Sequence, residues 1–152
     1  MTMVRDMKGK RPQYFEATLQ LRNPTQDIVT FVEEEIQRLK IYVAKVVELK
    51  NGLDYFLADN SFTLALGKKL QQKFGGQIRH SSSLFSQKDG KEIYRGTVLY
   101  RKPDFSKGDT VIYAGDECIV KSMAKDILLV GITKPQKIHV KYSDMKQIKK
   151  KE

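Results

Sequence analysis

Alternating apolar and polar residues mark the first predicted strand, at residues 14–22. Its apolar positions share one face: Phe15, Ala17, Leu19 and Leu21. A period of two over nine residues is typical of a half-buried strand. A helical period follows, with apolar residues every three or four positions: Ile28, Val32, Ile36 and Leu39. We expect Asn23 to be the N-cap of this helix and Pro24 to lie in its first turn.

The same two periods predict the elements that follow. Strands are expected at 44–49 and 53–58, joined at Asn51-Gly52, a dipeptide typical of a type I′ turn. Asp59, Asn60 and Ser61 then cap a second helix, which Gly75-Gly76 ends. Its apolar stripe comprises Phe62, Leu66, Leu70 and Phe74. Two further strands, joined by a turn with Asp-Gly at its centre, are expected at 77–86 and 92–102.

This order of elements predicts an α+β fold in two domains. The first six elements fit a ferredoxin-like split βαβ sheet domain, an antiparallel sheet with both helices on one face and the last strand added as a hairpin. Proline and glycine break the periodicity at 102–108. The short strands beyond are typical of a small SH3-like β-barrel: 110–113, 117–122, 127–132 and 137–142. The predicted domains are 12–103 and 104–148.

Composition narrows the class of protein. Of the 152 residues, 40% are hydrophobic and 30% charged, which is typical of a globular chain with a core. No apolar run approaches the ~20 residues of a membrane span, and Met1 to Arg11 is too charged for a secretory signal. The single cysteine, Cys118, excludes an internal disulfide and a multi-cysteine zinc site. We therefore expect a cytoplasmic protein with no membrane partner.

Positive charge is concentrated in one part of the chain. The net charge is +10, and residues 60–102 carry nine basic and two acidic side chains, whereas residues 24–59 carry four and seven. A concentrated positive region attracts phosphate better than an even distribution does. The hypothesis is a first basic patch that binds RNA: Lys68, Lys69, Lys73, Arg79, Lys88, Lys91 and Arg95. An ordinary solvated lysine surface is the other interpretation, and Lys149 to Lys151 are expected to be a solvated tail.

Catalytic and metal-binding patterns are weak. The histidines are His80 and His139, and His80 precedes three serines. Neighbours along a strand point to opposite faces, so His80 and Ser81 would not meet. Two histidines and one cysteine in separate strands do not form a metal-binding pattern. The sequence predicts neither an enzyme nor a cofactor or metal.

Two blocks of the central sequence resemble a known family. They are Gly52-Leu53-Asp54-Tyr55-Phe56 and the segment 90–98, Gly-Lys-Glu-Ile-Tyr-Arg-Gly-Thr-Val. At this spacing they resemble the adaptor family of the large ribosomal subunit that is named for nonsense-mediated mRNA decay, third member, and that occurs in archaea and eukaryotes. The resemblance covers most of residues 12–142. Residues 111–120 are similar to the first barrel of the hypusine-containing translation factor, which the family shares.

Two departures limit what this resemblance implies. The segment 122–126 is too short to be the loop that carries hypusine, so the modification is not assigned to Lys125. The Cys-x-x-Cys zinc modules that precede the sheet domain in the family are absent from the sequence, so zinc is not carried over. We expect an archaeal-type member or a fragment of a longer protein.

The resemblance implies a non-catalytic assembly or maturation factor that binds the large ribosomal subunit and its RNA. Ribosomal proteins and other assembly factors are further candidate partners. A second basic patch is expected in loops of the barrel: Lys125, Lys134 and Lys137. Three alternatives stay open: a general nucleic-acid-binding module, a small hydrolase on a ferredoxin-like scaffold, and a protein adaptor that docks through the acidic residues Glu33 to Glu35.

Overall fold

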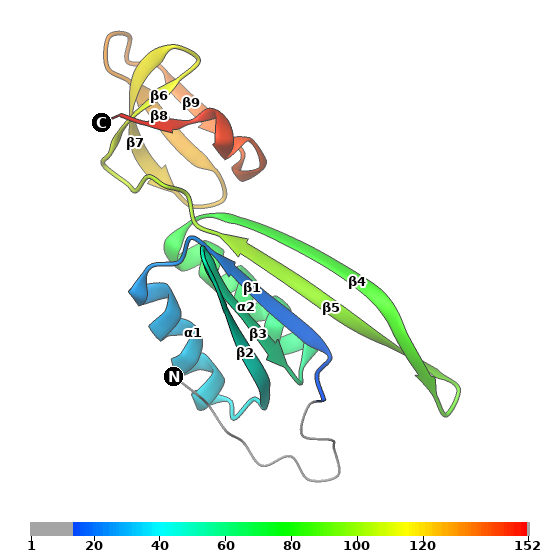
Figure 1. Cartoon of the computed structure of the whole chain (residues 1–152). Helices are drawn as coiled ribbons and strands as arrows, with labels where there is room; N and C mark the ends of the chain where they lie inside the picture. Colours follow the sequence, from blue (N-terminus) through cyan, green and yellow to red (C-terminus); the bar gives the residue numbers. More distant parts are fainter. Residues whose placement is uncertain (1–13, 152) are drawn as a thin grey trace. The chain divides into compact units, whose positions relative to one another are not determined.

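The computed structural model describes residues 14–151 and has a mixed α+β fold with two sheets (Figure 1). The chain divides into two compact units. Of the described residues, the first unit comprises 14–69 and 78–101, and the second comprises 70–77 and 102–151. The division into two separate domains at 12–103 and 104–148 stays a prediction.

The sheet of the first unit has five strands in the order β2-β3-β1-β5-β4. Their bounds are β1 Ala17–Arg22, β2 Val43–Leu49, β3 Gly52–Leu57, β4 Gln77–Lys88 and β5 Lys91–Arg101. β1 is central: it pairs antiparallel with β3 and parallel with β5. Ala17, Leu19 and Leu21 are buried, so the predicted alternation in β1 is confirmed there.

The helices α1 (Gln26–Arg38) and α2 (Asn60–Phe74) lie on one face of this sheet (Figure 1). We call it the helix-covered face; Ala17, Leu57 and Gly96 face each other across three of its strands. The helices contribute buried apolar side chains, among them Ile28, Val32, Ile36 and Leu66. Leu39 belongs to the predicted stripe of α1 but is 47% exposed, because it is the C-cap of the helix.

The start of α1 differs from the prediction at two positions, Asn23 and Pro24. The helix begins at Gln26, so Pro24 lies before it and not in its first turn. The N-cap of α1 is Thr25, whose Oγ1 accepts a hydrogen bond from the Ile28 amide at 3.4 Å. Asn23 instead has φ +57° and forms the turn after β1, so its predicted role as N-cap is wrong. At α2, the Asp59 carboxylate accepts from the Phe62 amide at 2.8 Å, as an N-cap does. Gly75 follows the last helical residue with φ +70°, which confirms the predicted stop.

The position of the β4–β5 hairpin corrects the predicted sheet. The strand after α2 was expected inside the sheet and the last strand at its edge, with every pair antiparallel. Instead β5 lies beside β1 and parallel to it, and β4 is at the edge. The physical reason is burial: β5 supplies the buried side chains Val98 and Tyr100, whereas the serine-rich middle of β4 is exposed. The ferredoxin-like description therefore remains only an approximate prediction.

Two glycines in hairpin turns have different roles. Asp89 and Gly90 have φ of +53° and +76°, the left-handed values that a type I′ turn requires. The expected type I′ turn at Asn51-Gly52 is wrong, because neither residue has a positive φ. Gly52 is required for a different reason, since a Cβ there would overlap the carbonyl oxygen of Leu21 in the neighbouring strand.

The second unit contains a sheet in the order β10-β6-β7-β8-β9. Its bounds are β6 Thr110–Tyr113, β7 Asp116–Met123, β8 Ile127–Gly131, β9 Lys137–Val140 and β10 Lys149–Lys150. Buried side chains on these strands and nearby form its core, among them Phe105, Val111, Val120, Ile127 and Leu129. Within residues 14–151, no pairing joins β9 to β10, so the SH3-like barrel remains a prediction.

The basic segment at the C-terminal end of the sequence is part of this sheet. A 3₁₀ helix, Tyr142–Gln147, precedes β10, in which Lys149 and Lys150 pair with Ile112 and Val111. The amide of Lys151 donates to the Thr110 carbonyl at 3.0 Å. The prediction of a solvated tail is therefore wrong at the backbone level, since these amides are needed to extend the sheet at β6.

Neither described helix is both long and apolar enough to cross a membrane.

Candidate nucleic-acid interface

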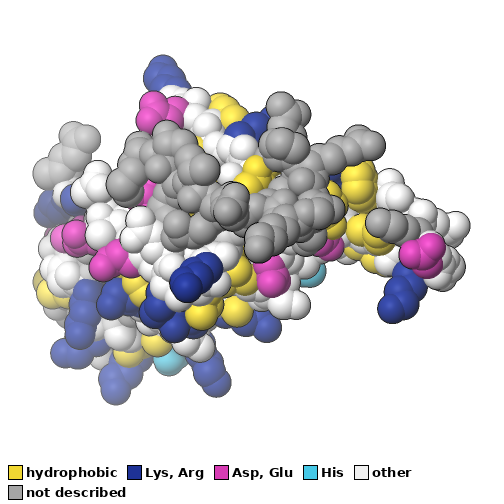
Figure 2. Space-filling view, turned by 90° about the horizontal axis from the view of Figure 1, so that it is seen from below, with side chains coloured by type: hydrophobic (Ala, Val, Ile, Leu, Met, Phe, Trp, Pro, Cys, Tyr) yellow, Lys and Arg dark blue, Asp and Glu magenta, His cyan; other side chains and the backbone are white. Residues whose placement is uncertain are grey.

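The hairpin of β4 and β5 extends past the other strands of the first sheet (Figure 1). β1 pairs with residues 96–101 of β5, so residues 91–95 continue beyond that pairing. Large apolar side chains are exposed on this extension: Leu84 is 54%, Phe85 44% and Tyr94 44% exposed. Figure 2 shows hydrophobic surface along the projecting hairpin, with charged side chains at its end. Such exposed apolar surface often marks a binding site.

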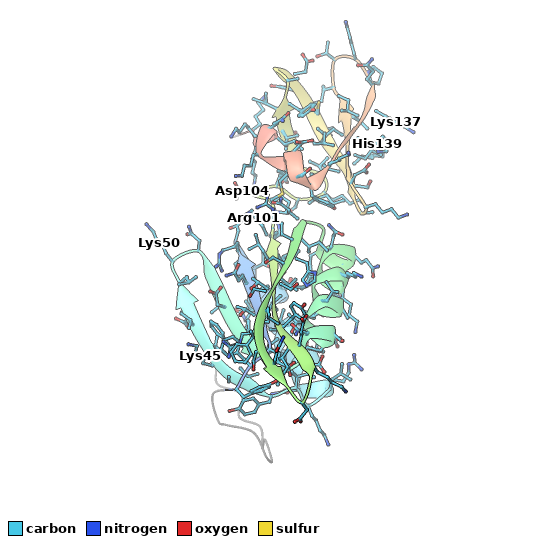
Figure 3. The ribbon with its side chains drawn as sticks, turned by 90° about the vertical axis from the view of Figure 1, so that its right-hand side faces the viewer. Lys45, Lys50, Arg101, Asp104, Lys137 and His139 are labelled. Atoms are coloured by element: carbon cyan, nitrogen blue, oxygen red, sulfur yellow. The ribbon has the colours of Figure 1, made fainter. Side chains whose placement is uncertain are left out.

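The face of the first sheet opposite the helices is called the open face here. One row of paired residues defines it across four strands: Lys45, Phe56, Thr18 and Thr97. Thr18, Phe56 and Thr97 each alternate with buried neighbours on the helix-covered face, as strand geometry requires. The neighbours of Lys45, in the edge strand β2, are half-buried. Figure 3 shows that Lys45 and Arg101 lie towards opposite ends of this sheet.

Cationic and aromatic side chains contact one another in a row over the open face. Lys45 Nζ lies 4.6 Å from the centre of the Phe56 ring, and Phe56 meets Phe15 edge to face at 4.9 Å. Arg95 Cζ lies 3.9 Å from the ring centre of Phe15 and 3.6 Å from that of Phe85. We call these five residues the cation–aromatic row. Lys45, Phe56, Arg95 and Phe85 come from β2, β3, β5 and β4, and Phe15 lies two residues before β1, so the row follows the spatial order of the sheet.

Arg95 is the best-fixed cation of this row. Its guanidinium lies between two aromatic rings, and its Nε donates to the Phe15 carbonyl at 3.2 Å. Nearby, burial and a hydrogen bond to Glu16 raise the pKa of Tyr14 to about 12, so the phenol stays neutral. A guanidinium held flat between rings keeps its charge and presents a preorganised planar surface.

The charge of the open face is mostly positive. Besides Lys45 and Arg95, alternation places Arg79, Lys91 and Arg101 on it. Among the described strand residues of this face, the acidic one is Asp54, whose Oδ1 accepts from Arg22 Nη1 at 2.7 Å. Its charge is therefore compensated within the sheet, and the remaining cations determine the sign of the surface.

The structure divides the first predicted patch between two surfaces. Lys68, Lys69 and Lys73 lie on α2, which packs on the helix-covered face. Lys69 Nζ is bound to Glu35 at 2.8 Å, and Arg38 also contacts that carboxylate at 2.9 Å. These two hydrogen bonds lower the pKa of Glu35 to about 2. One of the three lysines is thus already neutralised by an acid of α1.

The other members of the first patch belong to the hairpin. Arg79, Lys91 and Arg95 occupy open-face positions of β4 and β5, and Arg79 and Lys91 are exposed. Lys88 ends β4, but its side chain lies outside the described part of the structure. The patch is therefore two candidate surfaces on opposite sides of one sheet, and a single RNA segment lying flat on one side would not reach both.

The lysines of the second predicted patch also lie apart. Lys125 is in the turn between β7 and β8, whereas Lys134 and Lys137 lie at the connection between β8 and β9. Because β8 separates these two turns, they are at opposite ends of the strand. All three side chains are exposed. Beside Lys134 is a cavity of about 190 Å³ whose lining includes Asp116 and Glu117, so its charge is mixed.

His80 and Ser81, the residues behind the hydrolase hypothesis, point to opposite faces of the sheet. The His80 ring lies near Gly96, on the helix-covered face, so alternation directs Ser81 to the open face.

The acidic residues of the docking hypothesis have contacts within the first unit. Glu33 is buried and accepts a hydrogen bond from the Tyr55 hydroxyl at 3.2 Å. With Glu35 bound by Arg38 and Lys69, two acids of the suggested docking segment have internal partners. Within residues 14–151, no three His, Cys, Asp or Glu side chains cluster as metal ligands would.

Sequence reasoning missed most of the cation–aromatic row. It selected Arg95 for its charge, assigned Phe15 to the core and left Lys45, Phe56 and Phe85 unassigned. Phe15, Phe56 and the hairpin that carries Phe85 and Arg95 are far apart in the sequence, and the strand order brings them together. A usable signal was that Phe56 alternates with the core positions Tyr55 and Leu57 of its strand, where a polar residue is the ordinary choice. Phe85 gave no such signal, since its neighbours in β4 are not buried.

Comparison with protein-family models matches residues 14–101 to the model described as NMD3, second domain. A search of curated proteins finds no match. The matched range contains the whole sheet of the first unit, both helices and the cation–aromatic row.

Proposed function

This chain belongs to the NMD3 family, and from that premise we propose that it binds the large ribosomal subunit as a non-catalytic assembly or maturation adaptor. The family is associated with the large ribosomal subunit. Basic surfaces of this chain would contact ribosomal RNA there, and ribosomal proteins or other assembly factors would be neighbouring partners. The cytoplasm is the proposed place of action.

The family match over residues 14–101 is the observation that carries this proposal. Charge supports it, because residues 60–102 have a net charge of +7 and lie almost wholly within the match. Contacts between lysine or arginine and phosphate give affinity for folded RNA without reading its sequence. The proposed mechanism is occupancy, in which the adaptor covers functional RNA surfaces while the subunit matures.

Co-sedimentation with purified large and small ribosomal subunits over a salt series tests the proposal. We expect selective binding to the large subunit and an affinity that falls steeply as salt rises. Equal binding to both subunits would contradict the adaptor function. So would the absence of binding to the large subunit at low salt.

Charge reversal on each candidate surface then locates the contact. Arg79→Glu with Lys91→Glu tests the open face, and Lys68→Glu with Lys73→Glu tests the surface of α2. We expect the open-face pair to weaken subunit binding and reduce the salt dependence. Lys107→Glu with Lys146→Glu is the matched control, since both side chains are exposed and the change in net charge is the same. If neither test pair weakens binding more than this control does, contact between the first predicted patch and RNA is contradicted.

A general RNA-binding module is the second candidate function, and the exposed Phe85 beside Arg95 favours it. Stacking of this kind accepts any unpaired base and requires no ribosome. This alternative predicts comparable affinity for naked RNA and for intact subunits. A large preference for the intact large subunit would exclude it.

A further inference from the structure

The open face combines three features that suit an unpaired nucleic-acid strand. It has flat aromatic surface, positive charge along neighbouring strands and little uncompensated negative charge. Unpaired bases stack on aromatic rings and arginine planes, while the phosphates between them need cations. Double-stranded RNA does not expose its base planes and cannot use the first feature.

Phe85 has the geometry of a stacking residue. Arg95 covers one part of the ring at 3.6 Å, yet the residue remains 44% exposed at the edge strand of the sheet. The row continues behind Arg95 through Phe15 and Phe56, so the guanidinium cannot be displaced without breaking other contacts. The exposed ring is therefore held in place before any ligand arrives, which reduces the entropy cost of binding.

Cations lie on the same face at several strands. Lys45 is at the β2 end of the row, Arg79 and Lys91 belong to the hairpin, and Arg101 lies at the end of β5 (Figure 3). A strand of nucleotides passing over Phe85 would meet positive charge on either side. Asp54 is compensated by Arg22, and the Glu16 carboxylate accepts a hydrogen bond from Tyr14.

We propose that the open face binds single-stranded RNA, with an unpaired base stacked on Phe85 next to Arg95. This inference rests on the proposed RNA-binding function and specifies its surface and its ligand, an unpaired segment of RNA instead of a duplex. Arg79 and Lys91 contact the phosphates, and the row from Arg95 to Lys45 supports the stacking ring.

The first test measures the affinity of the full chain for a fluorescent ten-nucleotide single-stranded RNA. Phe85→Ala is expected to weaken binding at least about fivefold, the low end of what one stacked base contributes. Leu84→Ala is the matched control: Leu84 is the neighbour on the opposite face of the same strand and is 54% exposed. The inference is overturned if the two variants bind the single-stranded RNA equally well. It is also overturned if Phe85→Ala lowers the affinity for duplex RNA as much as the affinity for single-stranded RNA.

A second variant keeps the test independent of folding. The sequence contains no tryptophan, so Phe85→Trp introduces one reporter at the proposed stacking position. Single-stranded RNA should quench its fluorescence and bind at least as tightly as it does to the natural chain. Leu84→Trp should show little quenching. Equal quenching at both positions would overturn the inference.

The subunit measurement separates this inference from the function on which it rests. If Phe85→Ala does not weaken binding of single-stranded RNA while the chain still binds the large subunit selectively, only the proposed stacking surface is refuted. Retention of the Phe85 effect on short RNA without binding to the large subunit supports the stacking surface and refutes the ribosomal adaptor.

Discussion

The two faces of the first sheet are made by the same strands but stabilised in different ways. On the helix-covered face, Leu19, Leu57 and Val98 are buried under two helices, and their contribution is the removal of apolar surface from water. On the open face, Phe56 and Phe85 keep part of their surface in water and are held by cations. The difference teaches that one face of this sheet has its packing partners within the described fold, whereas the other is ordered but still able to accept a ligand.

The largest expected effect sharpens this contrast at adjacent positions of β1. Leu19 is fully buried, and Leu19→Ala should lower the free energy of unfolding by about 2–5 kcal/mol, because it leaves a cavity under the helices. Gln20→Ala, one residue later on the open face, should change it by less than about 0.5 kcal/mol. Urea denaturation followed by circular dichroism measures both. Similar losses at the two positions would mean that the open face is also packed in solution.

The second prediction concerns a polar contact beneath the helix-covered face. The Tyr55 hydroxyl donates to Glu33 at 3.2 Å, and burial together with that carboxylate raises the pKa of the phenol. Tyr55→Phe leaves the Glu33 carboxylate buried with one fewer donor, so we expect a loss of about 1–2 kcal/mol in the free energy of unfolding. Phe56→Tyr, at the next position on the open face, is the control. An unchanged stability for Tyr55→Phe would show that Glu33 is hydrated.

The third prediction tests whether the cation–aromatic row exists before ligand binding. A double-mutant cycle between Arg95→Ala and Phe85→Ala should give a coupling of about 0.5–1 kcal/mol in the free energy of unfolding. The same cycle between Arg95 and Leu84 should give none, because Leu84 points to the other face. Zero coupling between Arg95 and Phe85 would indicate a row that assembles only on the ligand.

The smallest effect depends on pH and is found on the outer surface of the helices. Arg38 and Lys69 lower the pKa of Glu35 to about 2, so the carboxylate stabilises the fold above its unfolded pKa of about 4.3. This contribution is lost as the pH falls from about 5 towards 2. Because Arg38 and Lys69 are largely exposed, it should be under about 1 kcal/mol. Glu35→Gln should reduce the pH dependence of the unfolding midpoint in that window; an unchanged profile would contradict the ion pairs.

The helices and strands could be predicted from local sequence pattern, but which strands pair with one another in the sheet could not. The alternation at Ala17, Leu19 and Leu21 and the cap at Asp59 depend on residues close in sequence, and both are present. The partner of β1 depends on whether β4 or β5 offers the better buried face, which is a comparison across about eighty residues. The same limit applies to the second sheet, where a lysine-rich segment becomes β10 because β6 has an edge to complete.

The candidate site shows this limit more strongly. Charge density identified Arg79, Lys91 and Arg95 without any structure. It could not separate them from Lys68 and Lys73, because net charge carries no information about the face of a sheet. It also could not find Phe85, whose importance arises from a contact with Arg95 that depends on hairpin geometry.

The central place of β1 has a consequence for the order in which the protein can assemble. β1 is the earliest strand of the sheet in sequence, yet one of its two neighbours, β5, ends at Arg101. At the usual 5–20 residues per second, a ribosome needs roughly 4–16 s to synthesise the chain between them. During that interval the edge of β1 that later pairs with β5 has no strand beside it. Nascent β1 is therefore a candidate client for chaperones that bind emerging chains, and the sheet is completed late in synthesis.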